Sequence, residues 1–156
     1  MTTYTADLEA AGVQPVQNAT GDVTRVAIFA LTAAFGLNDL VKMLTLPANA
    51  YVVDVVIGTD AALDTNATST ISYDVGDSNA AQRYIAAKAQ GNNVPLPPYH
   101  MDQAAGLGYQ IGTNTGDNVV VVKIHAAPAT GATSGNLRVA VTYGFQTRTP
   151  TTDTND

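Results

Sequence analysis

The chain has 156 residues, enough for one domain with a buried core, and only 13% of them are charged. The net charge is −6 and the seven basic residues are scattered singly, which argues against binding to nucleic acid or to an anionic membrane. Cysteine is absent, so disulfides, cysteine nucleophiles and cysteine–zinc sites are excluded.

The first 22 residues contain Pro15 and show little periodicity, and we expect an extended N-terminal arm over residues 1–22. The chain opens without the basic and apolar regions of a signal peptide. No run approaches the ~20 apolar residues that a membrane span needs. We therefore expect a protein that is made in the cytoplasm.

The next segments alternate with the period of a strand. In the strand predicted from Val23 to Leu31, Val26 and Ile28 share one face, and the other face holds Val23, Ala27, Phe29 and Leu31. Further strands are predicted over 39–46, 51–57 and 69–75. In the second of these, one face is expected to hold Tyr51, Val53, Val55 and Ile57. In the third, Ile71, Tyr73 and Val75 are expected to point inward, and the outward residues are expected to be Ser72 and Asp74.

The second half of the chain continues this pattern. Residues 82–89 fit either a short helix or a strand, and the proline- and glycine-rich segment 91–106 predicts a long loop. A short strand is predicted over 109–112 and longer strands over 118–126 and 136–146. In the last strand the inward residues are expected to be Leu137, Val139, Val141, Tyr143 and Phe145.

About eight short strands without an amphipathic helix predict an all-β fold. We expect a single antiparallel β-sandwich over residues 23–146, jelly-roll-like, between the arm and a flexible polar tail at 147–156. An immunoglobulin-like sandwich has a similar number of strands and remains an alternative.

Acidic residues gather in the middle of the chain, as Asp60, Asp64, Asp74 and Asp77. Hard cations favour such oxygen ligands, but the spacing matches no calcium loop, and the favoured interpretation is turn-forming aspartates without a metal. The spacing of Asp77 and Arg83 predicts an ion pair, worth less than about 1 kcal/mol if it is exposed. We expect Tyr84 and Ile85 to anchor this region by burial.

The chain offers no catalytic pattern. Its only glutamate, Glu9, lies in the arm, so no glutamate pairs with an acid across a cleft. The imidazoles are His100 and His125, and no Gly-x-Ser-x-Gly elbow accompanies them. We expect no enzyme activity, no catalytic residues and no cofactor, and we expect His125 to face solvent or a partner.

One loop is a candidate contact with a partner. Its apolar and aromatic residues, which show no hydrophobic period, are Leu96, Pro97, Pro98, Tyr99 and Met101. Such a loop either plugs one end of the sandwich or contacts another protein, and the sequence favours neither.

Three stretches carry a resemblance to a known family. The run from Asp39 to Ile57, DLVKMLTLPANAYVVDVVI, and the later ISYDVGDSN and RYI resemble virion structural proteins of tailed bacteriophages, of the head decoration or cement type. The resemblance implies a non-enzymatic protein that binds and stabilises the capsid shell from its outer surface. It implies synthesis in the host cytoplasm, the major capsid protein as partner, and a homo-oligomer, expected to be a trimer.

Two other functions remain as alternatives. A carbohydrate-binding or fibre/tail structural domain would stack sugars on aromatic faces, for which the candidates are Tyr51, Tyr73, Tyr84, Tyr99 and Tyr109. A small hydrolase would need a triad or a metal set, and neither appears.

Overall fold

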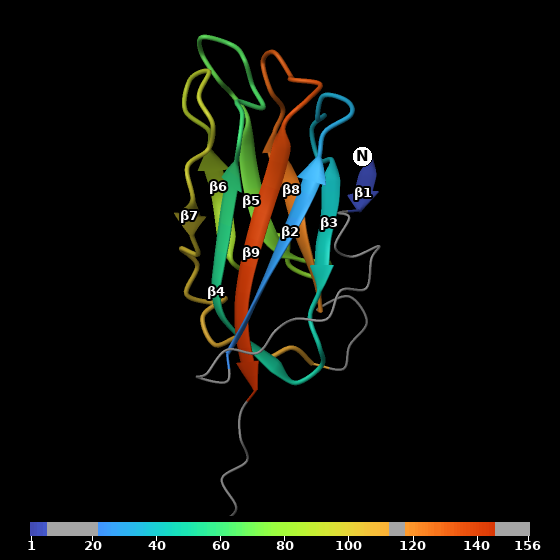
Figure 1. The fold of residues 1–156 in the computed structure, drawn as a ribbon, viewed down its shortest axis with the longest axis vertical. Coiled ribbons are helices and arrows are strands. Elements are labelled where there is room, and N and C mark those ends of the chain that lie inside the picture. The colour runs from blue at the N-terminus through green and yellow to red at the C-terminus, as the bar shows by residue number, and fades with distance from the viewer. Residues whose placement is uncertain (6–21, 113–117, 146–156) are drawn as a thin grey trace, which may run out of the picture.

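The computed structural model describes residues 1–5, 22–112 and 118–145, and these residues form strands without a helix (Figure 1). Most of the predicted arm and the whole predicted tail lie outside the described residues. The nine strands are β1 (Thr3–Thr5), β2 (Val23–Ala30), β3 (Leu40–Thr45), β4 (Ala50–Thr59), β5 (Ser72–Asp77), β6 (Ile85–Ala89), β7 (Tyr99–His100), β8 (Val119–Ala126) and β9 (Asn136–Phe145).

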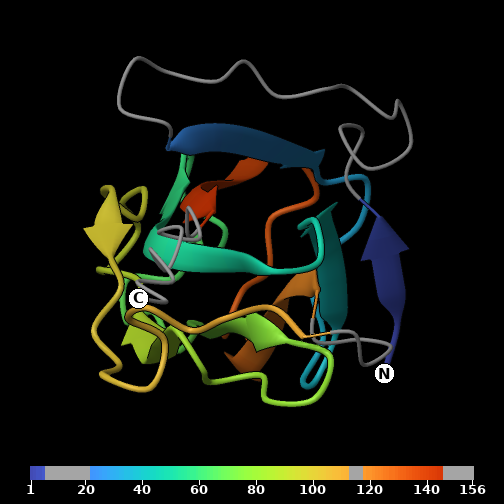
Figure 2. The same cartoon turned by 90° about the horizontal axis from the view of Figure 1, so that it is seen from below.

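The strands form two sheets that pack face to face around one core (Figure 2). One sheet has the order β1-β3-β8-β5-β6 and the other the order β2-β9-β4-β7. Strands distant in sequence are paired, β2 with β9 and β3 with β8, and every pairing except β1 with β3 is antiparallel. This is the strand order of a jelly roll, and the predicted all-β sandwich is confirmed.

Strand β2 shows the alternation that the sequence predicts. Val23, Ala27 and Phe29 are buried, whereas Val26 and Ile28 point out of the sandwich. The core face of β9 is also predicted correctly from Leu137 to Tyr143. Phe145, which was expected to point inward, is 46% exposed because it is the last residue of β9, at the lower end of the sandwich (Figure 1).

The prediction that Tyr51 and Val53 share one face of β4 with Val55 and Ile57 is wrong. Ala50 and Val52 are fully buried there, whereas Tyr51 and Val53 are only partly buried. The register against β9 shifts between Val52 and Asp54, which inserts one extra residue. A β-bulge of this kind changes the face on which later residues lie, so Val55 and Ile57 share the core face with Ala50 and Val52.

The outward face predicted for β5 is also wrong. Ser72 and Asp74 are buried, as is every residue of this strand. The segment that follows β5 folds back over its outer face. The approach is so close that a Cβ at Gly76 would lie 2.0 Å from the carbonyl oxygen of Ala80. A glycine is needed at this position for the backbone to approach so closely.

The remaining ambiguities of the sequence are settled by pairing. The segment 82–89 supplies the strand β6 and no helix. The strand predicted over 109–112 is reduced to a single bridge between Tyr51 and Gln110. No helix among the described residues is long and apolar enough to cross a membrane.

Candidate interaction surface

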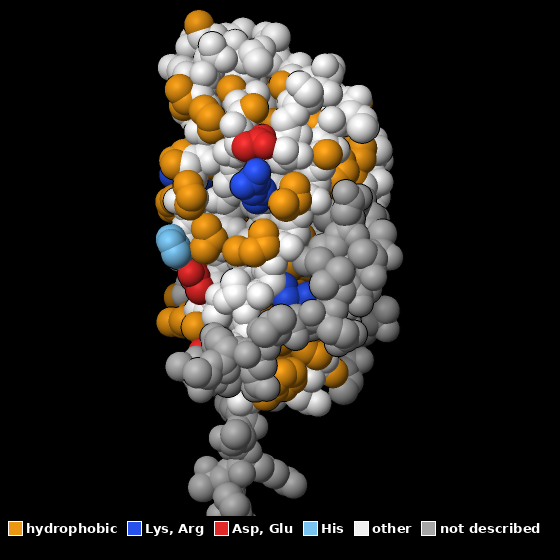
Figure 3. Space-filling model, viewed as in Figure 1, with side chains coloured by type: hydrophobic (Ala, Val, Ile, Leu, Met, Phe, Trp, Pro, Cys, Tyr) orange, Lys and Arg blue, Asp and Glu red, His pale blue; other side chains and the backbone are white. Residues whose placement is uncertain are grey.

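The outer face of the four-stranded sheet carries apolar side chains that the core does not use. Val26 and Ile28 on β2 are 50% and 41% exposed. Figure 3 shows further apolar groups on this face, over β2, β9 and β4. We define the apolar face as Val26, Ile28, Val56 of β4 and Ala140 of β9. Exposed apolar patches of this kind tend to mark contacts with other proteins.

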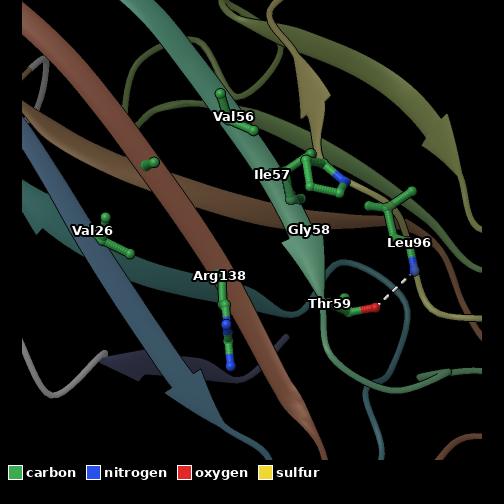
Figure 4. A pocket seen from close by; sticks show the side chains of 9 residues that line it. Val26, Val56, Ile57, Gly58, Thr59, Leu96 and Arg138 are labelled. Atoms are coloured by element: carbon green, nitrogen blue, oxygen red, sulfur yellow. Dashed lines mark hydrogen bonds between the residues drawn. The ribbon is translucent and has the colours of Figure 1, made fainter.

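A shallow hollow of about 240 Å³ lies beside this face. Val26, Val56 and Ala140 line it from three neighbouring strands, and the segment 96–98 forms its far wall (Figure 4). Leu96 is held against β4 by two hydrogen bonds. Its N–H donates to Thr59 Oγ1 at 2.8 Å and its carbonyl accepts from the N–H of Thr59 at 2.9 Å.

The rim of the hollow is polar. Arg138 is half exposed and lies 3.6 Å from Asp60, between Nη2 and Oδ2. Asp60 also accepts hydrogen bonds from the backbone and the side chain of Asn136. The side-chain hydrogen bond from Asn136 is the main reason why the pKa of Asp60 is lowered. An apolar centre with a polar rim is the usual arrangement of a protein–protein contact.

The candidate contact loop has some residues that close the sandwich and others that are accessible to a partner. Leu96 is buried, and Met101 packs against the core with its N–H bonded to the carbonyl of Val55 at 2.7 Å. Pro97 and Pro98 are exposed. Tyr99 is half-buried, with Lys88 Nζ 3.9 Å from its ring centroid. The loop therefore closes the side of the sandwich with Leu96 and Met101, and leaves two prolines accessible.

The two histidines each contact an aspartate. His100 Nδ1 lies 2.6 Å from Asp54 Oδ2, which joins β7 to β4. His125 Nδ1 lies 3.0 Å from Asp74 Oδ2, and its side chain is 44% exposed. Asp74 also accepts the N–H of Ala87 at 2.8 Å. Each imidazole thus joins its strand to a neighbouring strand through a carboxylate, which is a structural role.

The acidic residues do not converge on one point. Among the described residues, no group of three or more His, Asp or Glu side chains could hold a metal ion. Asp64 is fully buried and accepts five backbone N–H groups, from Asn66, Thr70, Ile71, Ala129 and Thr130. Burial alone would raise the pKa of Asp64, but these donors outweigh it and hold the pKa far below its usual range.

The five tyrosines that could stack on sugars differ in their burial. Tyr73 and Tyr84, two of the five candidates for sugar stacking, have no exposed surface. The other three, Tyr51, Tyr99 and Tyr109, are partly exposed. The apolar face was not singled out from the sequence, although the apolar residues on both sides of the 23–31 strand were a signal for it.

The fold is shared with proteins of phage capsids. A chain in the capsid of Ralstonia phage GP4 has a TM-score of 0.77 and 23% identity, over 94% of this chain and 99% of that chain. A chain in the acidic stable capsid of Helicobacter pylori bacteriophage KHP30 has a TM-score of 0.53 and 19% identity, over 83% and 90%. Scans against protein-family models and curated proteins find no match.

The third similarity extends to the sequence. A chain in the capsid asymmetric unit of cyanophage Pam1 is 30% identical, over 86% of this chain and 93% of that chain, with a TM-score of 0.62. The strand order and the two packed sheets define an all-β protein of the jelly-roll class. The chain belongs to the same family as the Pam1 capsid chain, and it is a structural protein of a phage virion.

Proposed function

We propose that this chain is a decoration or cement protein that binds the outer surface of a capsid shell and stabilises it without catalysis. Its partner is the major capsid protein, and it acts as a homo-oligomer, a trimer. The observation that carries the proposal is the apolar face on the outer side of a rigid sheet. Val26 and Ile28 project from adjacent outward positions of β2, which is paired along its whole length with β9.

The physical basis is burial repeated over many copies. Covering two half-exposed aliphatic side chains contributes about 1 kcal/mol each, which is a weak contact for a single copy. An oligomer that binds through several such faces at once gains avidity far above each single affinity. The low content of charged residues, 13%, fits such a surface because interface cores are depleted in charge.

The candidate contact loop extends this surface in the proposal. Pro98 lines the same hollow as Val26 and Val56, so a partner seated on the apolar face would also touch the loop. Among the five loop residues, the exposed Pro97 and Pro98 are the direct contacts, whereas Leu96 and Met101 support them from the core.

The test is binding to shells of the parent phage assembled without this protein. We expect the wild-type chain to co-sediment with such shells and to raise their temperature of rupture. Val26→Asp and Ile28→Asp should each weaken binding at least about tenfold, because a charge would enter the apolar contact. Leu107→Asp is the matched control, since Leu107 is 69% exposed, lies in a turn between β7 and β8, and does not line the hollow.

The controls make the outcome decisive. Each variant is first checked for wild-type thermal unfolding, because all three positions are at the surface. Retained binding by both β2 variants would exclude the apolar face as the contact. Failure of the wild-type chain to bind shells at all would contradict the cement function itself.

A further inference from the structure

Strand β1 closes one side of the sandwich, where the edges of the two sheets meet (Figure 2). It pairs with β3 in parallel, Thr3 opposite Leu40 and Thr5 opposite Lys42. A parallel pair is not joined by a tight hairpin, so the local connection does not force β1 to pair with the β3 of its own chain. We call the site that receives it the β1 seat, formed by β3, Asp39, Phe29 and Phe35.

The β1 seat recognises the strand by its backbone. The carboxylate of Asp39 accepts the N–H of Thr2 at Oδ1, 2.7 Å away, while its Oδ2 accepts the N–H of Gly36 at 2.8 Å. The N–H of Leu40 donates to the carbonyl of Thr2 at 2.8 Å. Asp39 is itself buried, and the bond from Gly36 holds its carboxylate in place whether or not a strand is bound.

One side chain of β1 completes the core. The ring of Tyr4 lies 5.1 Å from that of Phe29 and 5.8 Å from that of Phe35, between ring centroids. Phe29 comes from β2 and Phe35 from the segment before β3, so the aromatic group joins three parts of the chain. Without a strand in the seat, both phenylalanines would lose this aromatic neighbour, which favours an occupied seat.

The connection to β2 is long enough for the strand to come from elsewhere. Sixteen residues, 6–21, separate β1 from Asp22, and a chain of that length reaches at most about 50 Å. A domain of this size has a radius of gyration of about 15 Å, so this reach extends beyond one domain. Exchange of an identical element replaces each contact with the same contact in another copy and therefore costs little.

We propose that the β1 seat takes the β1 strand of a second copy, so that the homo-oligomer is held together by strand exchange. The inference rests on the proposed homo-oligomer and names the element that would link its copies. Each copy then supplies Thr2 and Tyr4 to the Asp39 and the aromatic pair of its neighbour, and the exchange closes into a ring.

The chain contains no cysteine, so introduced thiols report only on the chosen pair. Leu40→Cys and Thr3→Cys are placed on separate, differently tagged copies that are refolded together and then oxidised. We expect a disulfide between the two tags, in yield well above that of like-tagged pairs. The matched control places Val26→Cys and Ala140→Cys on separate copies, because these residues are partners within one β-sheet pair and should not link different chains.

The double variant Thr3→Cys/Leu40→Cys can form its disulfide either between two chains or within one chain. Covalent oligomers on a non-reducing gel support exchange, whereas a single monomeric band with an internal disulfide at every concentration overturns it.

A second measurement does not need a disulfide. Tyr4→Asp should convert the oligomer to monomer by light scattering while the sandwich stays folded, and an unchanged oligomer overturns the proposal. If a chain that shows no exchange still binds shells, strand exchange is overturned and the cement function is supported.

Discussion

Arg83 donates from Nε to the carboxylate of Asp77, and that carboxylate has no exposed surface. The same carboxylate accepts the N–H groups of Asn79 and Ala80, at 2.8 and 2.7 Å. The guanidinium lies over the ring of Tyr109, with Cζ 3.8 Å from the centroid. Together these contacts hold the segment after β5 against the sheet. The ion pair predicted from the sequence is confirmed, but it is buried on the acidic side.

Replacing Arg83 should therefore cost more than the loss of a surface ion pair. Arg83→Met leaves a buried carboxylate without its cation, and we expect the free energy of unfolding to fall by about 3 kcal/mol. Arg138→Met is the control, because the Arg138 and Asp60 side chains are 53% and 34% exposed and 3.6 Å apart, and it should cost less than about 1 kcal/mol. Urea unfolding measures both, and equal losses would contradict the difference in burial.

Gly76→Ala tests the segment that covers β5. The new Cβ would lie 2.0 Å from the oxygen of Ala80 and 2.5 Å from the carbonyl carbon of Ala81, so the backbone must move away. We expect a loss of about 3 kcal/mol or more, with faster hydrogen exchange at the amides of Asn79 and Ala80. Gly58→Ala meets only ordinary contacts of 3.4 Å and beyond, and should change stability little.

Asp64→Asn tests the buried carboxylate that joins residues 66–71 to residues 129–130. An amide offers one oxygen in place of two, so some of the five N–H donors lose their acceptor and face an NH₂ group. We expect a loss of about 3 kcal/mol in the free energy of unfolding. Asp54→Asn, at a partly exposed site with a histidine partner, is the control, and a similar loss there would contradict this assignment.

The low pKa of Asp64 also predicts how stability depends on pH. In the unfolded chain an aspartate has a pKa of about 3.9, and in the folded chain the pKa of Asp64 is far lower. The folded state therefore binds fewer protons, and the stabilisation is fully present above about pH 5 and is lost as the pH falls below about 4.

The measurement is the free energy of unfolding against pH from 7 downward. The wild-type curve should fall steeply in acid, and the Asp64→Asn curve should fall less steeply because one such carboxylate is gone. Parallel curves would show that Asp64 does not carry the acid sensitivity. Asp39 and Asp60, whose pKa values are also lowered, would then be the next carboxylates to replace.

The sequence alone determined the fold class and most of the core. Alternation over 23–31 and 136–146 identifies the buried face of both strands, because the two-residue period of a strand is visible in the order of apolar residues. The sequence also indicated the class of phage virion proteins, through the run around 39–57 and the motif that ends in Val-Gly-Asp.

Only the tertiary structure decided the faces near the bulge in β4 and the burial of Asp74 and Asp77. A bulge is a property of two paired strands, and the cover over β5 comes from a segment that folds back onto it. The same holds for Asp64, whose donors at 129 and 130 lie 65 residues or more along the chain. Long-range partners of this kind leave no local pattern, since they exist only after the two sheets have formed.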